Sequence, residues 1–380
     1  WILGGVLALC GGLSLAELGA MIPCSGGSVE FARRAFGGTI GYLVAMVSIF
    51  CGYFLSLAVI GLLLGQYVNQ LLPTPVPIGW IASLAIVAAF VSQIFGLHAG
   101  YRFNTALSFV KFGFVALFVF AGLLWPISSR MAAPALSETV THPGMISAAV
   151  ASATLTVSFA YLGWAAGADI AGDMKRPGRN VPLSIITAIV LVFAIYIGVN
   201  IVYLRVIDPA AMLDADGTPM QAIGGVAARL LFGTAVGNAM AAVIALLFFS
   251  TMVSGIITGA RIIESMAHSR EIPEWIGVRL PNGVPMRALI VLTVASLASL
   301  AIGNLDDILG LLTVLVNIFS SLSVTAVLVL RRTMPDAPRP FRVPLYPVTP
   351  IIYMALAGWS IAASVMDGGL NAIIASIAAV

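Results

Sequence analysis

The stretch from Thr154 to Pro182 holds the residues with the clearest capacity for chemistry, because an apolar run changes character there. Side-chain bulk is lost at Gly163, Ala165, Ala166 and Gly167. A carboxylate then follows at Asp169. Small residues weaken helix propensity, and a charge at the centre of a membrane helix costs about 2.5 to 3.5 kcal/mol, so the pattern indicates a helix interrupted beside a polar cavity. Because free backbone groups at such a break can bind the charged ends of a ligand, we predict that residues 159–169 form half of a substrate-binding site.

Two other residues of this stretch, Asp169 and Phe159, each have two interpretations, and Asp173 has one. Asp169 either lines an inward release path, where it would favour cationic solutes, or is a carboxylate satisfied by a neighbouring hydroxyl or arginine. Asp173 lies one turn further along the same helix face, beside a basic loop, and is interpreted as a structural ion pair or cap. Phe159 is either a packing residue or an aromatic lid over the site.

Lys111 is the second candidate, because it lies within an apolar run at residues 104–125. At 1.5 Å per residue from Arg102, it would lie roughly 10 to 14 Å inside a hydrocarbon core about 30 Å thick. A lysine stem spans only about 6 Å, so the ammonium would need carbonyls and hydroxyls within the protein. Such a group could replace a coupling sodium ion or carry a proton. The alternative is a lysine at the end of a helix whose boundary lies elsewhere.

Partners for Lys111 are available on a long apolar run at residues 235–267. Its hydroxyl residues include Ser250, Thr251, Ser254 and Thr258. Serine and threonine commonly hydrogen-bond to the carbonyls of their own membrane helix, which is the competing interpretation. We predict that Lys111, Thr251 and Ser250 form an ion-coupling site.

The composition indicates an integral membrane protein. Of the 380 residues 60% are hydrophobic and 9% are charged, with a mean hydropathy of +1.07, whereas a soluble domain is about 25% charged. Apolar runs of spanning length lie near residues 1–22, 37–69, 76–97, 104–125, 145–174, 182–206, 235–267, 286–303, 306–330 and 346–364, with a partial run after 369. We therefore predict an all-α, multi-pass protein with a single transmembrane domain at residues 1–380, in the lipid bilayer of a bacterial plasma membrane.

Charge and cysteine content exclude several other classes of protein. Most of the 18 Lys and Arg residues fall in one alternating set of loops, which is therefore assigned to the cytoplasm. The net charge of +3 then reflects topology, and we expect no nucleic-acid partner. The three cysteines, Cys10, Cys24 and Cys51, have no metal-ligand spacing and suggest no disulfide framework. We expect no metal and no cofactor, and we find no catalytic cluster that would suggest an enzyme.

Five stretches resemble the amino acid, polyamine and organocation transporter superfamily, and most closely its L-type and bacterial amino acid permeases. They are LAELGAMIPCSGGSVEFARRAFGGTIGYL at 15–43, RFNTALSFVKFGFVALFVFAGL at 102–123, FAYLGWAAGADIAGDMKRPGRNVP at 159–182, GARIIESMAHSREIP at 259–273 and LRRTMPDAPRPFRVPLYP at 330–347. The resemblance implies a leucine-transporter-like five-plus-five inverted repeat with two additional helices. The first apolar run here corresponds to the family's second helix. We therefore expect an N-terminally truncated chain that lacks the family's first helix and its half of the substrate site.

The resemblance also assigns roles to individual residues. Phe159 corresponds to the gating aromatic of the family, and Ala165 falls where relatives carry a polar or acidic residue that faces the substrate. Gly163 and the backbone through Ala166 correspond to the unwound segment. Lys111 matches the lysine that in several relatives occupies the place of a sodium ion, and Thr251 matches its hydroxyl partner. Eukaryotic relatives join a heavy chain through a cysteine in the loop corresponding to residues 66–79; this loop has none, so we expect no disulfide-linked heavy chain.

Together these features predict a secondary active amino acid transporter that works by alternating access, with proton-coupled symport favoured. The alternative mechanism is exchange of one amino acid for another or for a polyamine. An amino acid sensor that does not transport is the alternative from a different functional class. The small Ala165 favours neutral substrates, whereas Asp169 favours cationic ones; we favour neutral substrates or a broad range of substrates.

Overall fold

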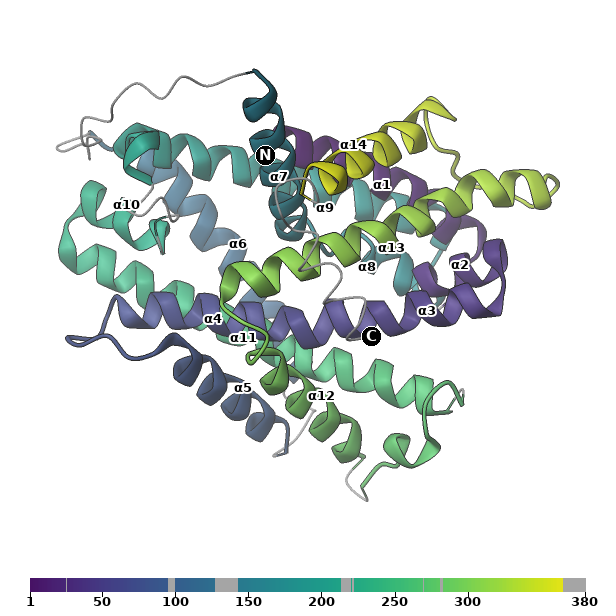
Figure 1. Ribbon diagram of the computed structural model, residues 1–380, viewed down its shortest axis with the longest axis horizontal. Helices are drawn as coiled ribbons and strands as arrows, with labels where there is room; N and C mark the ends of the chain where they lie inside the picture. Colours follow the sequence, from purple (N-terminus) through teal and green to yellow (C-terminus); the bar gives the residue numbers. More distant parts are fainter. Residues whose placement is uncertain are drawn as a thin grey trace. The chain divides into compact units, whose positions relative to one another are not determined.

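The computed structural model describes residues 1–24, 26–94, 100–126, 143–212, 220, 222–268, 270–280 and 283–364, and the regular elements among them are helical (Figure 1). In chain order these are α1 Ile2–Met21, α2 Gly27–Phe36, α3 Gly38–Ile49, the π-helix η1 Phe50–Leu55, α4 Ser56–Asn69, α5 Ile78–Ile94, α6 Gly100–Leu124, α7 Pro143–Ala160, α8 Ala166–Asp169, η2 Ala171–Asp173, α9 Pro177–Val206, η3 Pro209–Met212, α10 Ile223–Phe232, α11 Thr234–His268, η4 Glu274–Gly277, α12 Met286–Ser299, α13 Leu305–Thr333 and α14 Val348–Ser364. The prediction of an all-α protein is confirmed.

Five helical segments of the described residues are long and apolar enough to cross a membrane. They are Ile2–Met21, Gly38–Asn69, Pro177–Val206, Thr234–His268 and Leu305–Thr333. Six shorter apolar helical stretches lie at Ile78–Ile94, Phe109–Leu124, Val150–Ala160, Ile223–Phe232, Met286–Ser299 and Val348–Ala363. The helix predicted from residue 182 begins five residues earlier, at Pro177, because a proline in the first helical position has no N–H to leave unpaired.

The described chain divides into two compact units, and each is built from separated segments. The first comprises residues 1–52, 141–194 and 309–380, and the second comprises residues 53–140 and 195–308. The single transmembrane domain over residues 1–380 stays a prediction.

In the first unit, α1 is the central helix and packs against α7, α8 and α14 (Figure 1). Small residues on α1 also let α9 pack closely against it. A Cβ atom on Gly12 would lie 2.4 Å from Ile189 Cδ1, and one on Gly19 would lie 2.9 Å from Val181 Cγ1. Glycine therefore lets α9 approach the backbone of α1 more closely than any larger residue could.

A buried carboxylate, Glu17, joins α1 to the segment before α14 within the same unit. Its side chain is 1% exposed and accepts hydrogen bonds from Arg331 Nε at 2.8 Å and from the Val343 backbone N–H at 2.6 Å. Arg339 Nε lies 3.4 Å from the same carboxylate, and the Arg331 guanidinium stacks 3.7 Å from the centre of the Tyr346 ring. A charge buried this deeply is tolerated because its partners are also charged.

In the second unit, α11 packs against α4, α5, α10 and α12 (Figure 1). Close contacts again depend on glycine. A Cβ on Gly61 would lie 3.2 Å from Ala82 Cβ, and one on Gly259 would lie 2.8 Å from Tyr53 Cδ1. Glycine therefore allows the α4 backbone to approach α5 and the α11 backbone to approach Tyr53.

Candidate substrate and coupling sites

The predicted interruption of the helix after Thr154 is present. Helix α7 ends at Ala160, and α8 begins at Ala166 after a five-residue turn. Tyr161 N donates to Ser158 O at 3.2 Å and Leu162 N donates to Phe159 O at 3.0 Å, which closes α7 with a tighter turn. Residues 161–165 form a turn, and Ala166 N donates to Gly163 O at 3.1 Å where α8 begins. The break therefore interrupts the regular helical hydrogen bonding beside the predicted site.

Gly163 is the conformational centre of this break. Its φ is +117°, a region in which a residue with a Cβ is strained. A Cβ atom placed on Gly163 would meet no atom within 4 Å among the described residues, so open space lies beside its backbone. Ala165 and Phe159 are half-buried on either side of this position, and Ala166 is exposed. Their roles toward a substrate stay predictions.

Two contacts fix the ends of the break, and both were missed in the sequence. Trp164 is 8% exposed and its ring packs edge-to-face on Tyr353, with 6.2 Å between the ring centres. Asn317 Nδ2 on α13 donates to Ser158 Oγ at 2.7 Å and to Thr313 O at 2.8 Å. An asparagine within an apolar spanning run was the available signal for the second contact, because a buried amide requires partners.

Asp169 is held by the turn that precedes α2. Its Oδ1 accepts from Ser28 N at 3.0 Å and from Ser28 Oγ at 2.9 Å, and its backbone carbonyl accepts from Gly26 N at 2.9 Å. A Cβ on Gly27 would lie 2.5 Å from Ala168 O, so this turn touches the α8 backbone directly. This arrangement matches the second interpretation, a carboxylate satisfied by a hydroxyl. The role of Asp169 in a release path stays a prediction, and the side chain of Asp173 lies outside the described residues.

The second unit brings Lys111 and Thr251 together, although they are 140 residues apart in the chain. Lys111 Nζ on α6 donates to Thr251 Oγ1 on α11 at 3.1 Å. Thr251 Oγ1 in turn donates to Leu247 O of its own helix at 2.9 Å. The Thr251 hydroxyl thus makes both the contact with Lys111 and the hydrogen bond within its own helix. The two interpretations of this residue therefore hold together.

The other hydroxyls of this helix bond along it. Ser254 Oγ donates to Ser250 O and Thr258 Oγ1 donates to Ser254 O, each at 3.0 Å. Ser250 is buried, and the hydroxyl that contacts Lys111 is that of Thr251. The assignment of Lys111, Thr251 and Ser250 to ion coupling stays a prediction.

The described residues contain no group of three or more His, Cys, Asp or Glu side chains that could hold a metal ion. Cys10 and Cys51 are buried and Cys24 is half-buried, and all three are free thiols.

An interrupted helix and a lysine on an apolar helix are features typical of membrane transport proteins. The sequence matches the family described as Amino acid permease over residues 1–376. This chain therefore belongs to the amino acid permease family, within the amino acid, polyamine and organocation superfamily that its motifs resemble. It is an integral, multi-pass membrane protein.

Three relatives illustrate the range of this family. The chain is 26% identical over 388 residues to the Serine/threonine exchanger SteT of Bacillus subtilis, covering 98% of this chain and 85% of that protein. It is 26% identical over 367 residues to the Large neutral amino acids transporter small subunit 2 of Mus musculus, covering 93% of this chain and 66% of that protein. It is also 26% identical over 361 residues to the human Cystine/glutamate transporter, covering 91% of this chain and 69% of that protein.

Proposed function

We propose that this protein is a secondary active transporter that moves amino acids by alternating access, with the break between α7 and α8 as part of its substrate site. The observation that carries the proposal is the backbone at Gly163, which has a positive φ and open space beside it. Backbone amides at a break in a helix carry partial positive charge and can donate to the carboxylate that all amino acids share. Phe159, Ala165 and Ala166 would contact the remainder of the substrate.

The chemistry at this break favours neutral amino acids. Ala165 offers neither charge nor bulk, and the Asp169 carboxylate is already bonded to Ser28. The names of two relatives agree with this class, since they describe exchange of serine and threonine and transport of large neutral amino acids. We therefore propose serine, threonine and larger neutral amino acids as the first substrates to test.

Lys111 is the proposed coupling residue, with proton symport as the favoured mechanism. Its ammonium is held by the neutral Thr251 hydroxyl, and the described residues show no carboxylate paired with it. Transfer of a proton from Lys111 would therefore not require an ion pair to break. Substrate binding and proton transfer would be linked if each favoured the same conformation of the protein.

Exchange is the second candidate mechanism, and the name of the bacterial relative favours it. In an exchanger Lys111 would be a permanent internal cation that fixes α6 to α11. Loss of its charge would then weaken the packing of α6 against α11, and uptake would remain independent of a proton gradient.

Uptake of radiolabelled serine into proteoliposomes containing the full-length protein distinguishes these mechanisms. An inward proton gradient is imposed in one set, and internal unlabelled serine is loaded in another. Gradient-driven accumulation by the wild type indicates symport, whereas uptake that needs internal serine and ignores the gradient indicates exchange. Binding of serine without uptake in either set would refute transport and favour a sensor.

Variants at Lys111 and Thr251 test the coupling residue. Under symport, Lys111→Ala and Lys111→Arg should both abolish gradient-driven accumulation, because neither side chain exchanges a proton near neutral pH. Under exchange, Lys111→Arg should keep most activity because the charge remains. Thr251→Ser is the matched control for Thr251→Val, since serine keeps the hydroxyl that contacts Lys111 and valine does not.

We also propose that the protein works without a disulfide-linked heavy chain. The loop at residues 66–79 has no cysteine, and Cys10 and Cys51 are buried. Electrophoresis of membranes with and without a reductant tests this directly. A band that shifts to the mass of a larger complex without reductant would refute it.

A further inference from the structure

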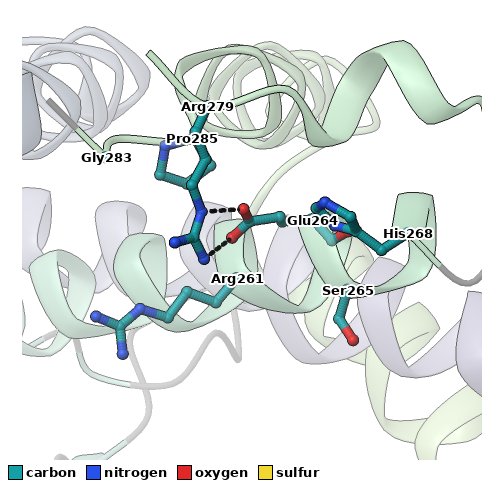
Figure 2. A pocket seen from close by; sticks show the side chains of 7 residues that line it. All are labelled: Arg261, Glu264, Ser265, His268, Arg279, Gly283 and Pro285. Atoms are coloured by element: carbon teal, nitrogen blue, oxygen red, sulfur yellow. Dashed lines mark hydrogen bonds and ion pairs between the residues drawn. The ribbon is translucent and has the colours of Figure 1, made fainter. Parts of the chain in front are cut away.

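A cavity of about 700 Å³ opens at the end of α11 that the positive-inside pattern assigns to the cytoplasm. It is lined by Arg261, Glu264, Ser265, His268, Arg279, Gly283 and Pro285 (Figure 2). All of these residues belong to the second unit. The site therefore lies within one compact unit of the protein, and none of its lining residues is a coupling or substrate residue described above.

One arginine of the cavity already has a counter-ion. Glu264 is 4% exposed, and its two carboxylate oxygens accept from Arg279 Nε and, at 3.0 Å, from Arg279 Nη2. These hydrogen bonds and the charge of Glu264 raise the pKa of Arg279, so its guanidinium is a permanent cation. The pair fixes Arg279 over α11, as Figure 2 shows, and leaves its third nitrogen available.

The second arginine has no counter-ion. Arg261 is exposed and makes no hydrogen bond or ion pair within the part of the chain that the structure describes. Two guanidinium groups against the single Glu264 carboxylate leave one net positive charge in the cavity. In Figure 2 the Arg261 and Arg279 side chains lie on the same side of Glu264, and His268 lies on the other. The preferred ligand of this cavity is therefore an anion.

Two further polar side chains line the cavity. Ser265 is exposed one turn after Arg261, and its hydroxyl can donate. His268 Nδ1 donates a hydrogen bond to the Glu264 carbonyl oxygen at 2.8 Å, so Nε2 of the neutral ring is an acceptor. The guanidinium and hydroxyl donors around this space match the several oxygens of a phosphate group.

The loop beside the cavity has the character of a membrane interface. Trp275 is 57% exposed, and Val278 and Leu280 in the same loop are also exposed. Arg287 Nη1 holds this loop by donating to Trp275 O at 2.9 Å. Exposed tryptophan with arginine is typical of the headgroup layer, where basic pockets meet anionic lipids.

We propose that this cavity binds a phosphate group at the cytoplasmic membrane surface, with Arg261 as its main ligand. The exposed Trp275, Val278 and Leu280 favour the headgroup of an anionic lipid over free phosphate as the source of that group. Binding there would stabilise the end of α11, whose other part carries Thr251. This inference does not depend on the transported substrate.

Thermal unfolding of the full-length protein in a neutral detergent tests the proposal at constant ionic strength. The probes are short-chain phosphatidylglycerol, short-chain phosphatidylcholine and inorganic phosphate. We expect phosphatidylglycerol to raise the unfolding midpoint, because a ligand that binds only the folded state stabilises it. Zwitterionic phosphatidylcholine should have little effect. In Arg261→Gln the concentration for half of the shift should rise about tenfold or more, the value of one charge-assisted hydrogen bond.

Arg332→Gln serves as the control, and Ser265→Asp is a second variant of the cavity. Arg332→Gln removes an exposed arginine at the end of α13, outside the cavity, and should respond as the wild type does. Ser265→Asp introduces a negative charge at an exposed position of the cavity and should also weaken the response, which tests the site should Arg261→Gln fold poorly. A midpoint raised equally by inorganic phosphate, and lost in both cavity variants, would keep the site and assign it to soluble phosphate. Equal responses of the wild type and both cavity variants to phosphatidylglycerol would overturn the proposal.

Discussion

Asp169 gives the sharpest test of how the broken helix is held, because charge and hydrogen bonding can be separated there. Its Oδ1 accepts two hydrogen bonds from Ser28, at 3.0 and 2.9 Å. A hydrogen bond to a charged group contributes about 1.5 to 3 kcal/mol, and the lower end applies to a site that is only partly buried. Asp169→Ala should therefore lower the free energy of unfolding by about 3 kcal/mol. Asp169→Asn keeps an acceptor oxygen and should lose only about 1 kcal/mol.

Unfolding of the protein in mixed micelles by added sodium dodecyl sulfate measures both losses. Ser28→Ala is the matched control, since it removes the hydroxyl bond and keeps the backbone N–H bond to Asp169. Its loss should be about half of that in Asp169→Ala. The double variant should be less destabilised than the sum of the two single variants, because both remove the same hydrogen bond.

Transport by these variants separates this structural role from a role in solute selection. We expect the ratio of lysine uptake to serine uptake to be unchanged in Asp169→Asn. The reasoning is refuted if Asp169→Asn keeps the stability of the wild type and selectively loses uptake of lysine. That result would show that the carboxylate acts on the solute through its charge.

Three other substitutions have defined outcomes. Gly163→Ala should cost about 1 to 3 kcal/mol through its φ of +117° and should slow serine uptake in proteoliposomes, whereas Gly310→Ala, at another glycine with open space beside it, should not. Glu17→Gln should destabilise by about 3 to 5 kcal/mol in the same micellar unfolding assay, because Arg331 and Arg339 lose their buried counter-ion; wild-type stability would contradict this. Gly41→Ala should cost about 1 to 3 kcal/mol, because its Cβ would lie 2.7 Å from Arg33 Cβ, and a neutral result would mean that α2 moves freely against α3.

A repeated corner shows how far the local sequence reaches. The pattern Ala-Arg-x-x-Phe-Gly-x-x-x-Gly occurs at residues 32–41 and again at residues 228–237. In both copies the first glycine ends one helix with a positive φ, 95° at Gly37 and 86° at Gly233. In both copies a Cβ on the second glycine would clash with the arginine, at 2.7 Å for Gly41 and at 2.0 Å for Gly237. This repeat agrees with the two-fold internal repetition that the family resemblance implies, and it was overlooked in the sequence.

The sequence by itself determined the all-helical membrane class, the interruption near Gly163 and the unusual position of Lys111. These features follow from local properties: the length of apolar runs, the conformational freedom of glycine and the free energy of placing a charge in a membrane. They can be read without knowing which helices are neighbours.

The tertiary structure alone decided the partners of the polar groups. Thr251 among four hydroxyls meets Lys111, Ser28 meets Asp169, and Asn317 meets Ser158. Each pair joins residues at least 140 positions apart, so the order of the chain does not reveal which hydroxyl will pair with which polar group. A buried polar group must find a partner, but packing of the helices determines which partner lies within hydrogen-bonding distance.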